Sequence, residues 1–314
     1  MSASMRSVRQ LAFGGPEVLQ LTEVERPVPL ATEVLVRVRA VGVNPVEAMI
    51  RSGQFPLLGQ PPFILGWDLC GVVEDMEPGV TRFQPGDEVY GMPFFPRAAG
   101  AYAEYVAAPS RQLARKPAGL SHAEAAALPL AGLTAWQALV DTAQVTAGQR
   151  VLIHGAGGGV GHLAVQIAKA RGAHVIGTAS AVKHDFVASL GADELIDYRA
   201  ADFAEQVDGV DVVLDTIGGD NARRSIGVLR PGGLLVTIVG RRDVDLAAST
   251  RTAGRRFAGL SVEPDYPGLE ALADLAESGK LRVHLQATLD LAAAAKAHEL
   301  LESGSVTGKI ALTV

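Results

Sequence analysis

The sequence has very little cysteine and no long apolar run. Cys70 is the only thiol among 314 residues, which excludes an intrachain disulfide and any zinc site built from several thiolates. We predict that Cys70 is a small buried residue on a strand. Although 48% of the residues are hydrophobic, Pro, Gly and charged residues break every apolar stretch before it reaches the length of a membrane span. No membrane-spanning segment is therefore expected.

The sequence also lacks a run of basic residues. Its formal net charge is -6, whereas proteins that hold nucleic-acid phosphates or anionic membranes cluster Lys and Arg. We therefore expect a small-molecule partner, with no nucleic acid and no membrane. Residues 1–15 lack the apolar stretch of a signal peptide, so a cytoplasmic location is expected.

Two kinds of apolar pattern follow one another along the chain. Residues 5–113 carry short alternating stretches separated by Gly, Pro and Asn, which predict a mainly β domain. Residues 121–140 are rich in Ala and Leu and predict helix with a break at Pro129. Strands rich in β-branched residues then alternate with helices, a pattern typical of a doubly wound parallel sheet. The expected strands of that sheet cover residues 150–154, 174–178, 194–197, 210–214, 233–238 and 257–262.

The expected fold class is α/β, with a Rossmann doubly wound parallel sheet plus a mainly β domain. We assign residues 126–264 to the Rossmann domain. Two helical segments follow Pro264, and a last strand over 309–313 is expected to pair back onto the first domain. The mainly β domain is therefore assigned residues 1–125 and 265–314.

A glycine-rich turn, residues 154–161, follows the first strand of the second domain and opens a helix. A strict G-x-G-x-x-G is absent, and the nearest alignment places Ala156, Gly158 and Gly161 at the three glycine positions. Small residues there permit a tight turn and close approach to a pyrophosphate, while the helix N-terminus offers N–H groups and positive potential. The pattern predicts a dinucleotide site, and a packing turn is the alternative. The expected binding residues are Ala156, Gly157, Gly158, Gly159 and Val160.

The end of the second strand favours NADPH over NADH. An Asp or Glu at that place binds the ribose 2′-hydroxyl of NAD, and this chain has neither between Thr178 and Lys183. Thr178, Ser180 and Lys183 instead offer hydroxyl and ammonium donors to a 2′-phosphate. Tyr198, just past the next strand, is expected to close over the same phosphate. Solvated surface positions are the alternative for Lys183 and Tyr198.

Several motifs in fixed order carry a resemblance to a known family. They are FGGPEVL at 13–19, VNPVE at 43–47, LGWDLCGVV at 65–73, PGDEVYG at 85–91, GLTA at 132–135, the glycine-rich turn, LGAD at 190–193 and GKI at 308–310. With them the sequence resembles the zinc-lacking quinone oxidoreductase branch of the medium-chain dehydrogenase/reductase superfamily, and within it the enone and 2-alkenal reductases. The resemblance implies that the first domain is a GroES-like catalytic domain and that the protein is a homodimer.

The resemblance also implies a site without metal. The family's zinc-dependent alcohol dehydrogenases have a metal-binding Cys near the place of Asn44 and a His in a Gly-His-Glu motif, whereas Trp67 and Asp68 follow Gly66 here. By the same resemblance, Asn44 and Thr134 flank the nicotinamide or the substrate carbonyl, and Lys309 reaches the cofactor or lies on the surface. Further cofactor contacts are expected at Ile217, Val239 and Gly240.

The expected reaction is hydride transfer from nicotinamide C4 of NADPH to a quinone or an α,β-unsaturated carbonyl such as an enone or alkenal. Without zinc as Lewis acid, conjugated acceptors are favoured because they delocalise the incoming charge. Asn44 is the candidate catalytic hydrogen-bond donor, and water, Tyr90 or Tyr102 supplies the proton. Two alternatives stay open, namely an enoyl thioester reductase and a non-catalytic NADPH-binding redox sensor.

Overall fold

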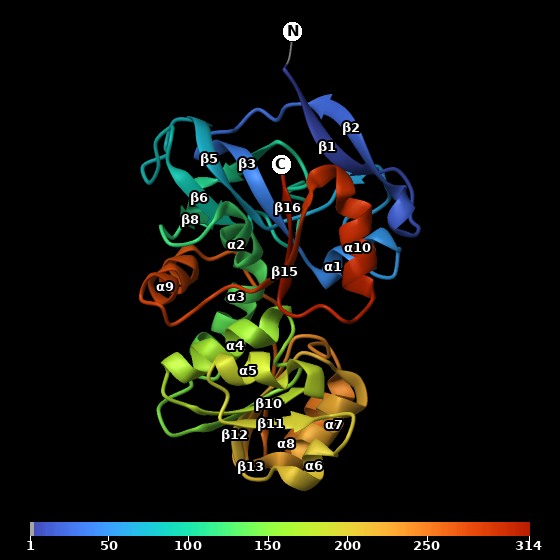
Figure 1. Cartoon of the computed structure of the whole chain (residues 1–314), viewed down its shortest axis with the longest axis vertical. Coiled ribbons are helices and arrows are strands. Elements are labelled where there is room, and N and C mark those ends of the chain that lie inside the picture. The colour runs from blue at the N-terminus through green and yellow to red at the C-terminus, as the bar shows by residue number, and fades with distance from the viewer. Residues whose placement is uncertain (1–2) are drawn as a thin grey trace. The chain divides into compact units, whose positions relative to one another are not determined.

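The computed structural model describes residues 3–314, which divide into two compact units (Figure 1). The first unit contains the residues up to Leu133 together with Glu263–Glu277 and Val283–Val314. The second contains Thr134–Val262 and Ser278–Arg282. In sequence, the second unit is thus largely inserted into the first.

The first unit is mainly β, as the alternating pattern predicts. Its 7-stranded sheet follows the order β15 (Leu285–Asp290), β16 (Lys309–Thr313), β3 (Glu33–Val43), β5 (Leu69–Met76), β6 (Glu88–Gly91) and β8 (Leu113–Arg115), with β7 (Tyr105–Pro109) also paired to β3. A smaller sheet has the order β2 (Leu19–Glu25), β1 (Ser4–Gln10) and β4 (Phe63–Ile64).

The last strand, β16, returns to the first unit as expected. It pairs antiparallel with β3, with Ile310 opposite Val43 and Thr313 opposite Ala40. In Figure 1 the red end of the chain therefore lies beside a blue strand. This pairing brings residues from opposite ends of the sequence into one buried layer, because Ile310 and Val43 are each 1% exposed.

Helices of the first unit begin at clear sequence signals. Asn44 is the N-cap of α1 (Pro45–Arg51), with Pro45 at the first helical position and Glu47 completing a capping box. Pro129 separates α2 (His122–Ala127) from α3 (Pro129–Trp136), which confirms the predicted break. The chain enters the second unit at Thr134, within α3, and continues there as a π-helical stretch (Gln137–Thr142). In the first unit, α9 (Tyr266–Glu277) and α10 (Ala294–Glu302) are the two helical segments expected after Pro264.

The second unit contains the predicted parallel sheet. Its strand order is β11 (Glu194–Asp197), β10 (His174–Ala179), β9 (Arg150–Ile153), β12 (Val210–Asp215), β13 (Leu229–Thr237) and β14 (Arg256–Gly259), and every neighbouring pair is parallel. The connecting helices are α4 (Gly159–Ala170), α5 (His184–Ser189), α6 (Phe203–Gln206), α7 (Gly219–Val228) and α8 (Val244–Thr252). The α/β fold class with a Rossmann sheet is confirmed.

Two of the predicted strands differ from the observed ones by more than one residue at one end. The strand expected over 233–238 begins earlier, at Leu229, because Leu229 pairs with Val210 and a register shift before Val212 accommodates the intervening Pro and Gly residues. The strand expected over 257–262 ends at Gly259, opposite Thr237, since its neighbour β13 ends there. Val239 and Gly240 consequently lie just beyond β13, which ends at Thr237.

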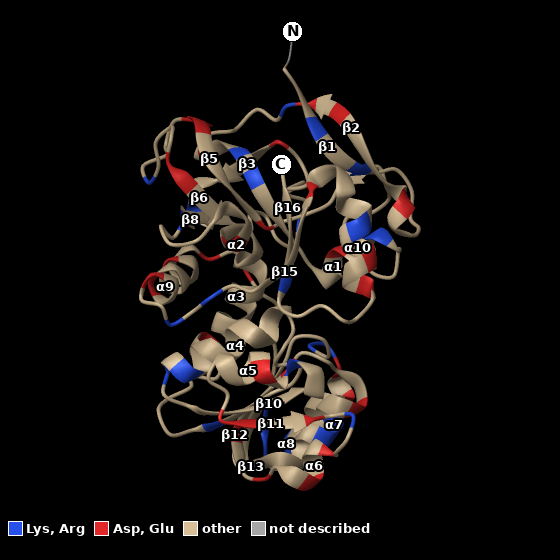
Figure 2. Cartoon of the chain, viewed as in Figure 1, with Lys and Arg blue, Asp and Glu red and all other residues tan. Residues whose placement is uncertain are grey.

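An apolar core lies under the parallel sheet. Leu152, Ile176 and Val213 on the central strands are completely buried and belong to one cluster with Phe203 and Leu246 from the helical connections. Strands buried on both faces read as continuous apolar runs, which is why this sheet is legible in the sequence. Acidic and basic residues are interspersed over each unit (Figure 2). Within residues 3–314, none of the helices combines the length and apolar character needed to span a membrane.

Candidate functional site

The carboxyl ends of β9 and β12 mark the place where a ligand site is expected in the second unit. The strand order reverses between these two strands, and open parallel sheets bind ligands outside the carboxyl ends at such a point. The glycine-rich turn follows β9 there. Gly155 has a φ of +65°, a left-handed conformation that glycine adopts without steric cost. A Cβ on Gly161 would overlap the Gly155 carbonyl oxygen, so the first turn of α4 packs against the turn before it.

This arrangement fits a dinucleotide pyrophosphate. The N-cap of α4 is Gly158, which has no side chain to bond the first-turn N–H groups, and α4 is 12 residues long. Free N–H groups and the helix dipole together favour an anion at this end. The motif alignment puts Ala156 at the first glycine position, but Gly155 has the left-handed conformation, while the Ala156 amide donates to the Thr178 carbonyl over 2.9 Å. Gly155 is therefore a candidate site residue that the motif alignment missed.

Thr178 is hydrogen-bonded to the glycine-rich turn. Its buried hydroxyl lies 3.1 Å from His154 Nδ1 and accepts a 3.3 Å hydrogen bond from the Gly155 amide. The other ring nitrogen of His154 lies 2.9 Å from the Ser225 hydroxyl. Burial lowers the pKa of His154 to about 4, so its ring is neutral at pH 7. The Thr178 hydroxyl therefore contacts both the strand end at His154 and the glycine-rich turn at Gly155.

A group of basic and hydroxyl residues follows β10 and β11. Ser180 precedes a short helical turn, Ala181–Lys183, and the Lys183 side chain lies against Gly157, where an added Cβ would approach Lys183 Cδ to 2.9 Å. Burial, and then the charge of Arg199, lower the pKa of Lys183. Tyr198 is 55% exposed and precedes Arg199. Arg199 was not among the residues predicted to bind the cofactor, although its position directly after Tyr198 is a visible signal in the sequence.

Two exposed aliphatic residues border the same edge of the sheet. Ile217 is 56% exposed and Val239 is 55% exposed, after β12 and β13 respectively. Cβ atoms added to Gly155 and Gly218 would lie 3.3 Å from Ile217 Cδ1 and 2.8 Å from Val239 Cγ1. The structure therefore brings the glycine-rich turn, Ile217 and Val239 together. Gly240 follows, and its amide donates to the Thr237 hydroxyl over 3.1 Å.

The first unit holds a buried polar cluster around Asn44, which we call the Asn44 cluster. The Asn44 side chain donates from Nδ2 to Asp68 over 3.0 Å, reaches Glu47 over 3.5 Å, and accepts a short hydrogen bond from Lys309 Nζ. Lys309 Nζ also donates to the Val43 carbonyl over 3.0 Å and lies 3.7 Å from Asp68. Lys309 is 3% exposed, so the predicted surface alternative for it is wrong. The cluster consists of Asn44, Glu47, Asp68, Tyr102, His298 and Lys309.

Burial dominates the protonation of the Asn44 cluster. It raises the pKa of Glu47 to about 7, against the effect of hydrogen bonds from the Asn44 amide and the Tyr102 hydroxyl. Burial likewise raises the pKa of Asp68 and lowers the pKa of Lys309, and their mutual attraction opposes both shifts. His298 lies 3.2 Å from the Tyr102 hydroxyl, and burial lowers its pKa to about 3.

The remaining candidates lie in protein interior. Thr134 on α3 is 5% exposed. Tyr90 and Tyr102, the candidate proton donors, are fully buried and donate to the Leu269 carbonyl and to Glu47 respectively. Cys70 is buried on β5, as predicted, with Sγ 3.3 Å from His122 Nδ1. Burial raises the pKa of this thiol, which opposes nucleophilic reactivity.

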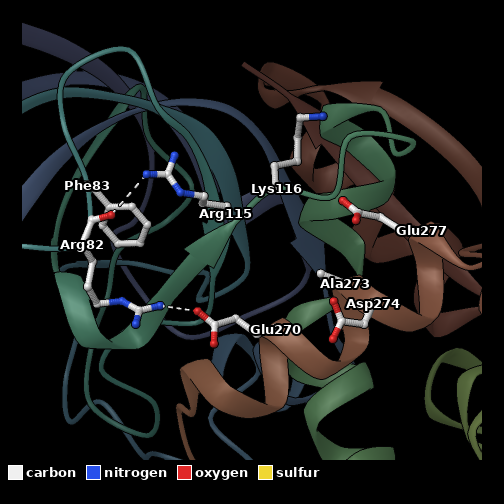
Figure 3. A pocket seen from close by; sticks show the side chains of 8 residues that line it. All are labelled: Arg82, Phe83, Arg115, Lys116, Glu270, Ala273, Asp274 and Glu277. Carbon is white, nitrogen blue, oxygen red and sulfur yellow. Dashed lines mark hydrogen bonds and ion pairs between the residues drawn. The ribbon is translucent and has the colours of Figure 1, made fainter.

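A separate cavity of about 340 Å³ lies in the first unit (Figure 3). Arg82 and Arg115 line it from one side and Glu270 on α9 from the other, with a 2.6 Å ion pair between Arg82 and Glu270. Arg115 is paired with Asp87 over 2.8 Å. Since both arginines are already paired with carboxylates, the cavity is poorly suited to attract a phosphate. Among residues 3–314, no group of three or more His, Cys, Asp or Glu side chains is placed to hold a metal ion.

Comparisons with known proteins agree with this architecture. Residues 30–118 match the alcohol dehydrogenase GroES-like domain, and residues 190–312 match the zinc-binding dehydrogenase family. The mouse (Mus musculus) quinone oxidoreductase is 34% identical over 98% of this chain and 97% of its own length. The solved quinone oxidoreductase of Coxiella burnetii is 36% identical, with a TM-score of 0.94 over 99% of this chain and 100% of that chain. A mycobacterial protein solved with NADPH is 30% identical, with a TM-score of 0.88 over 99% and 100% of the two chains.

The fold and the site at the carboxyl edge of the parallel sheet define an oxidoreductase with a nicotinamide-dinucleotide-binding fold. The first unit contains the matched GroES-like domain. The chain belongs to the family of these quinone oxidoreductases, within the medium-chain dehydrogenase/reductase superfamily.

Proposed function

We propose that the protein is a zinc-independent, NADPH-dependent reductase of quinones or α,β-unsaturated carbonyls. The observation that supports NADPH over NADH is a pair of neighbouring basic residues, Lys183 after β10 and Arg199 after β11. NAD-binding enzymes instead have an acidic residue at the end of the strand that corresponds to β10. Mutual repulsion of two neighbouring cations is relieved by an anion, which favours a 2′-phosphate over a 2′-hydroxyl. The mycobacterial relative solved with NADPH supports the same choice.

Different residues of the chain bind different parts of the cofactor. The α4 N-terminus and the glycine-rich turn bind the pyrophosphate, and Lys183, Tyr198 and Arg199 bind the 2′-phosphate. Ile217 and Val239 present exposed apolar surface that favours a flat ring and excludes water. When bound, NADPH supplies a hydride.

Asn44 is the residue we propose for contact with the substrate oxygen. Its Nδ2 makes one good hydrogen bond to Asp68 over 3.0 Å and a second, weaker contact to Glu47 over 3.5 Å. The second N–H is therefore the one that can be redirected to a developing oxyanion. A donor of this kind contributes about 3 kcal/mol to transition-state stabilisation where it faces the oxyanion. A conjugated acceptor suits a site with a single hydrogen-bond donor, because the acceptor itself delocalises the negative charge that develops on its oxygen.

The proposal is tested by following nicotinamide absorbance with purified, chelator-treated protein. NADPH and NADH are each compared against ortho- and para-quinones, 2-alkenals, cyclic enones and an enoyl thioester. Turnover with NADPH and a quinone or enone, unchanged by the chelator or by added Zn²⁺, is expected. Turnover confined to the enoyl thioester would replace the substrate class. NADPH binding with no turnover on any acceptor would replace the enzyme by a redox sensor.

A further inference from the structure

Asp215 is a completely buried carboxylate at the carboxyl end of β12 and was not among the site residues predicted from the sequence. Its Oδ1 accepts hydrogen bonds from the amides of Ile217 and Gly218 over 3.1 and 3.0 Å. Its Oδ2 accepts from the Gly218 amide over 3.1 Å and from the Thr237 hydroxyl over 2.8 Å. The Asn221 amide adds a 3.3 Å contact to Oδ1. All of these hydrogen-bond partners are donors, which matches the acceptor-only character of an ionised carboxyl.

These bonds join the segments that carry the two exposed aliphatic residues. The amides of Ile217 and Gly218 belong to the segment after β12. Thr237 ends β13, and its hydroxyl accepts from the Gly240 amide over 3.1 Å, so it links Asp215 to the segment that contains Val239. Asp215 is therefore bonded directly to the segment that carries Ile217, and through the Thr237 hydroxyl to the segment that carries Val239.

The same end of β12 is also joined to the glycine-rich turn. The Thr216 hydroxyl donates to the His154 carbonyl over 2.8 Å, and a Cβ on Gly155 would lie 2.8 Å from that hydroxyl. Gly218 has a φ of +80°, so its segment needs a fixed conformation that few other residues adopt. Charge-assisted bonds to backbone amides are among the stronger hydrogen bonds in proteins and keep such a segment in one conformation.

We propose that Asp215 is a positioning residue for the nicotinamide end of the cofactor. It holds the Ile217 and Val239 segments at a fixed separation, without contacting the ligand. This inference rests on the proposed NADPH-binding function. It implies that loss of the carboxylate weakens binding of the whole cofactor while binding of the adenosine end is preserved, because Lys183 and Arg199 lie after other strands.

The experiment uses the full chain and two probes, NADPH and 2′,5′-ADP, which lacks the nicotinamide end. Asp215→Asn turns an amide NH2 toward groups that are themselves donors, so we expect the Kd for NADPH to rise about tenfold, as for loss of one buried charge-assisted hydrogen bond. The Kd for 2′,5′-ADP is expected to stay unchanged. Amide hydrogen exchange of the protein without ligand is expected to accelerate at residues 216–218 and 238–240 and at no other segment.

A second pair of variants keeps the test informative if Asp215→Asn fails to fold. Thr237→Val removes the hydroxyl that links the two segments and is expected to weaken NADPH binding, whereas Thr237→Ser keeps the hydroxyl and is expected to restore it. Asp211→Asn is the matched control, since Asp211 lies at the other end of β12, where it accepts from the Arg150 amide over 2.8 Å and pairs with Arg230.

Each result separates this proposal from the function on which it rests. Equal weakening of NADPH and 2′,5′-ADP by Asp215→Asn, or equal effects of Thr237→Val and Thr237→Ser, would make Asp215 a general structural residue and overturn the inference. Failure of the unmodified protein to bind either probe would instead overturn the proposed NADPH-binding function.

Discussion

The Tyr102 hydroxyl donates a 2.7 Å hydrogen bond to Glu47 Oε2, and neither side chain is exposed to solvent. This contact joins two residues of the first unit that are far apart in sequence. The Tyr102 hydroxyl also lies 3.2 Å from Nε2 of His298 on α10. A carboxyl in such surroundings is easier to keep protonated than charged, because burial penalises the charged form. The Asn44 cluster should therefore make the stability of the protein depend on pH.

The first prediction concerns Glu47→Gln. The pKa of Glu47 is raised from its ordinary value of 4.5 to about 7, so its stabilising contribution is complete below pH 4.5 and is lost as the pH rises through 7. Relative to the wild type, the free energy of unfolding of the variant should increase by about 3 kcal/mol between pH 4.5 and 7.5. Urea unfolding across this range measures the difference.

His298 provides an internal contrast for that measurement. Its pKa is lowered to about 3, so its contribution is present above its ordinary pKa of 6.5 and is lost as the pH falls toward 3. The two groups therefore act in opposite directions in the wild type, and only the difference between the wild type and Glu47→Gln isolates the carboxyl. A difference that does not change with pH would show that Glu47 is charged in the folded protein.

The second prediction concerns the buried pair of Lys309 and Asp68. Lys309→Met removes the cation and leaves Asp68 buried with Asn44 and the Leu130 amide as its hydrogen-bond donors. We expect a loss of about 3 to 5 kcal/mol in the free energy of unfolding, as for breaking a buried ion pair. The double variant Lys309→Met with Asp68→Asn should recover part of this loss, measured by chemical denaturation of the two single variants and the double. Strict additivity would show that the pair does not interact.

The third prediction concerns Lys183→Ala. Loss of this ammonium should weaken NADPH binding tenfold to a hundredfold, or about 1.5 to 3 kcal/mol, and leave NADH binding unchanged. Arg199→Ala should act in the same direction, because Arg199 is near enough to lower the pKa of Lys183 and we propose that both cations bind the same phosphate. Lys280→Ala removes an exposed lysine of the same unit and serves as the control. Fluorescence titration with both cofactors gives the affinities, and equal weakening of NADH would contradict a phosphate role.

The fourth prediction compares two glycines. Gly161→Ala places a methyl group into the Gly155 carbonyl oxygen and should cost about 1 to 3 kcal/mol of stability, as overpacking does, together with loss of NADPH binding. A Cβ added to Gly227 on α7 would have nothing within 4 Å, so Gly227→Ala should raise stability by about 0.5 to 1 kcal/mol and leave binding intact. Thermal unfolding and the same titration check both. Unimpaired binding in Gly161→Ala would mean that close helix packing is not needed.

The sequence predicts those features that are local. The parallel sheet is visible because each central strand is a short apolar run next to a helical repeat, and the break at Pro129 follows from the missing amide hydrogen of proline. The Asn44 cluster was not visible as a unit because Lys309 and Asn44 are 265 residues apart. The role of Asp215 is not predictable for a related reason: an acid at the end of an apolar strand is typical of a surface residue, and only the fold places the amides of Ile217 and Gly218 around it. The contact between Thr178 and His154 likewise joins residues that no spacing rule connects.

The sheet of the first unit begins early in the sequence but is completed only by the last strand of the chain. The strands of the parallel sheet all lie within residues 134–262, so that sheet is complete before β15 and β16 emerge from the ribosome. Until then β3 lacks its partner β16, and the acids around Asn44 lack the ammonium of Lys309. Late in synthesis the nascent chain therefore has a complete parallel sheet beside an unfinished sheet in the first unit, whose open edge is exposed to wrong partners. Release of the last residues both pairs that edge and brings the Lys309 ammonium to Asp68 in a single event.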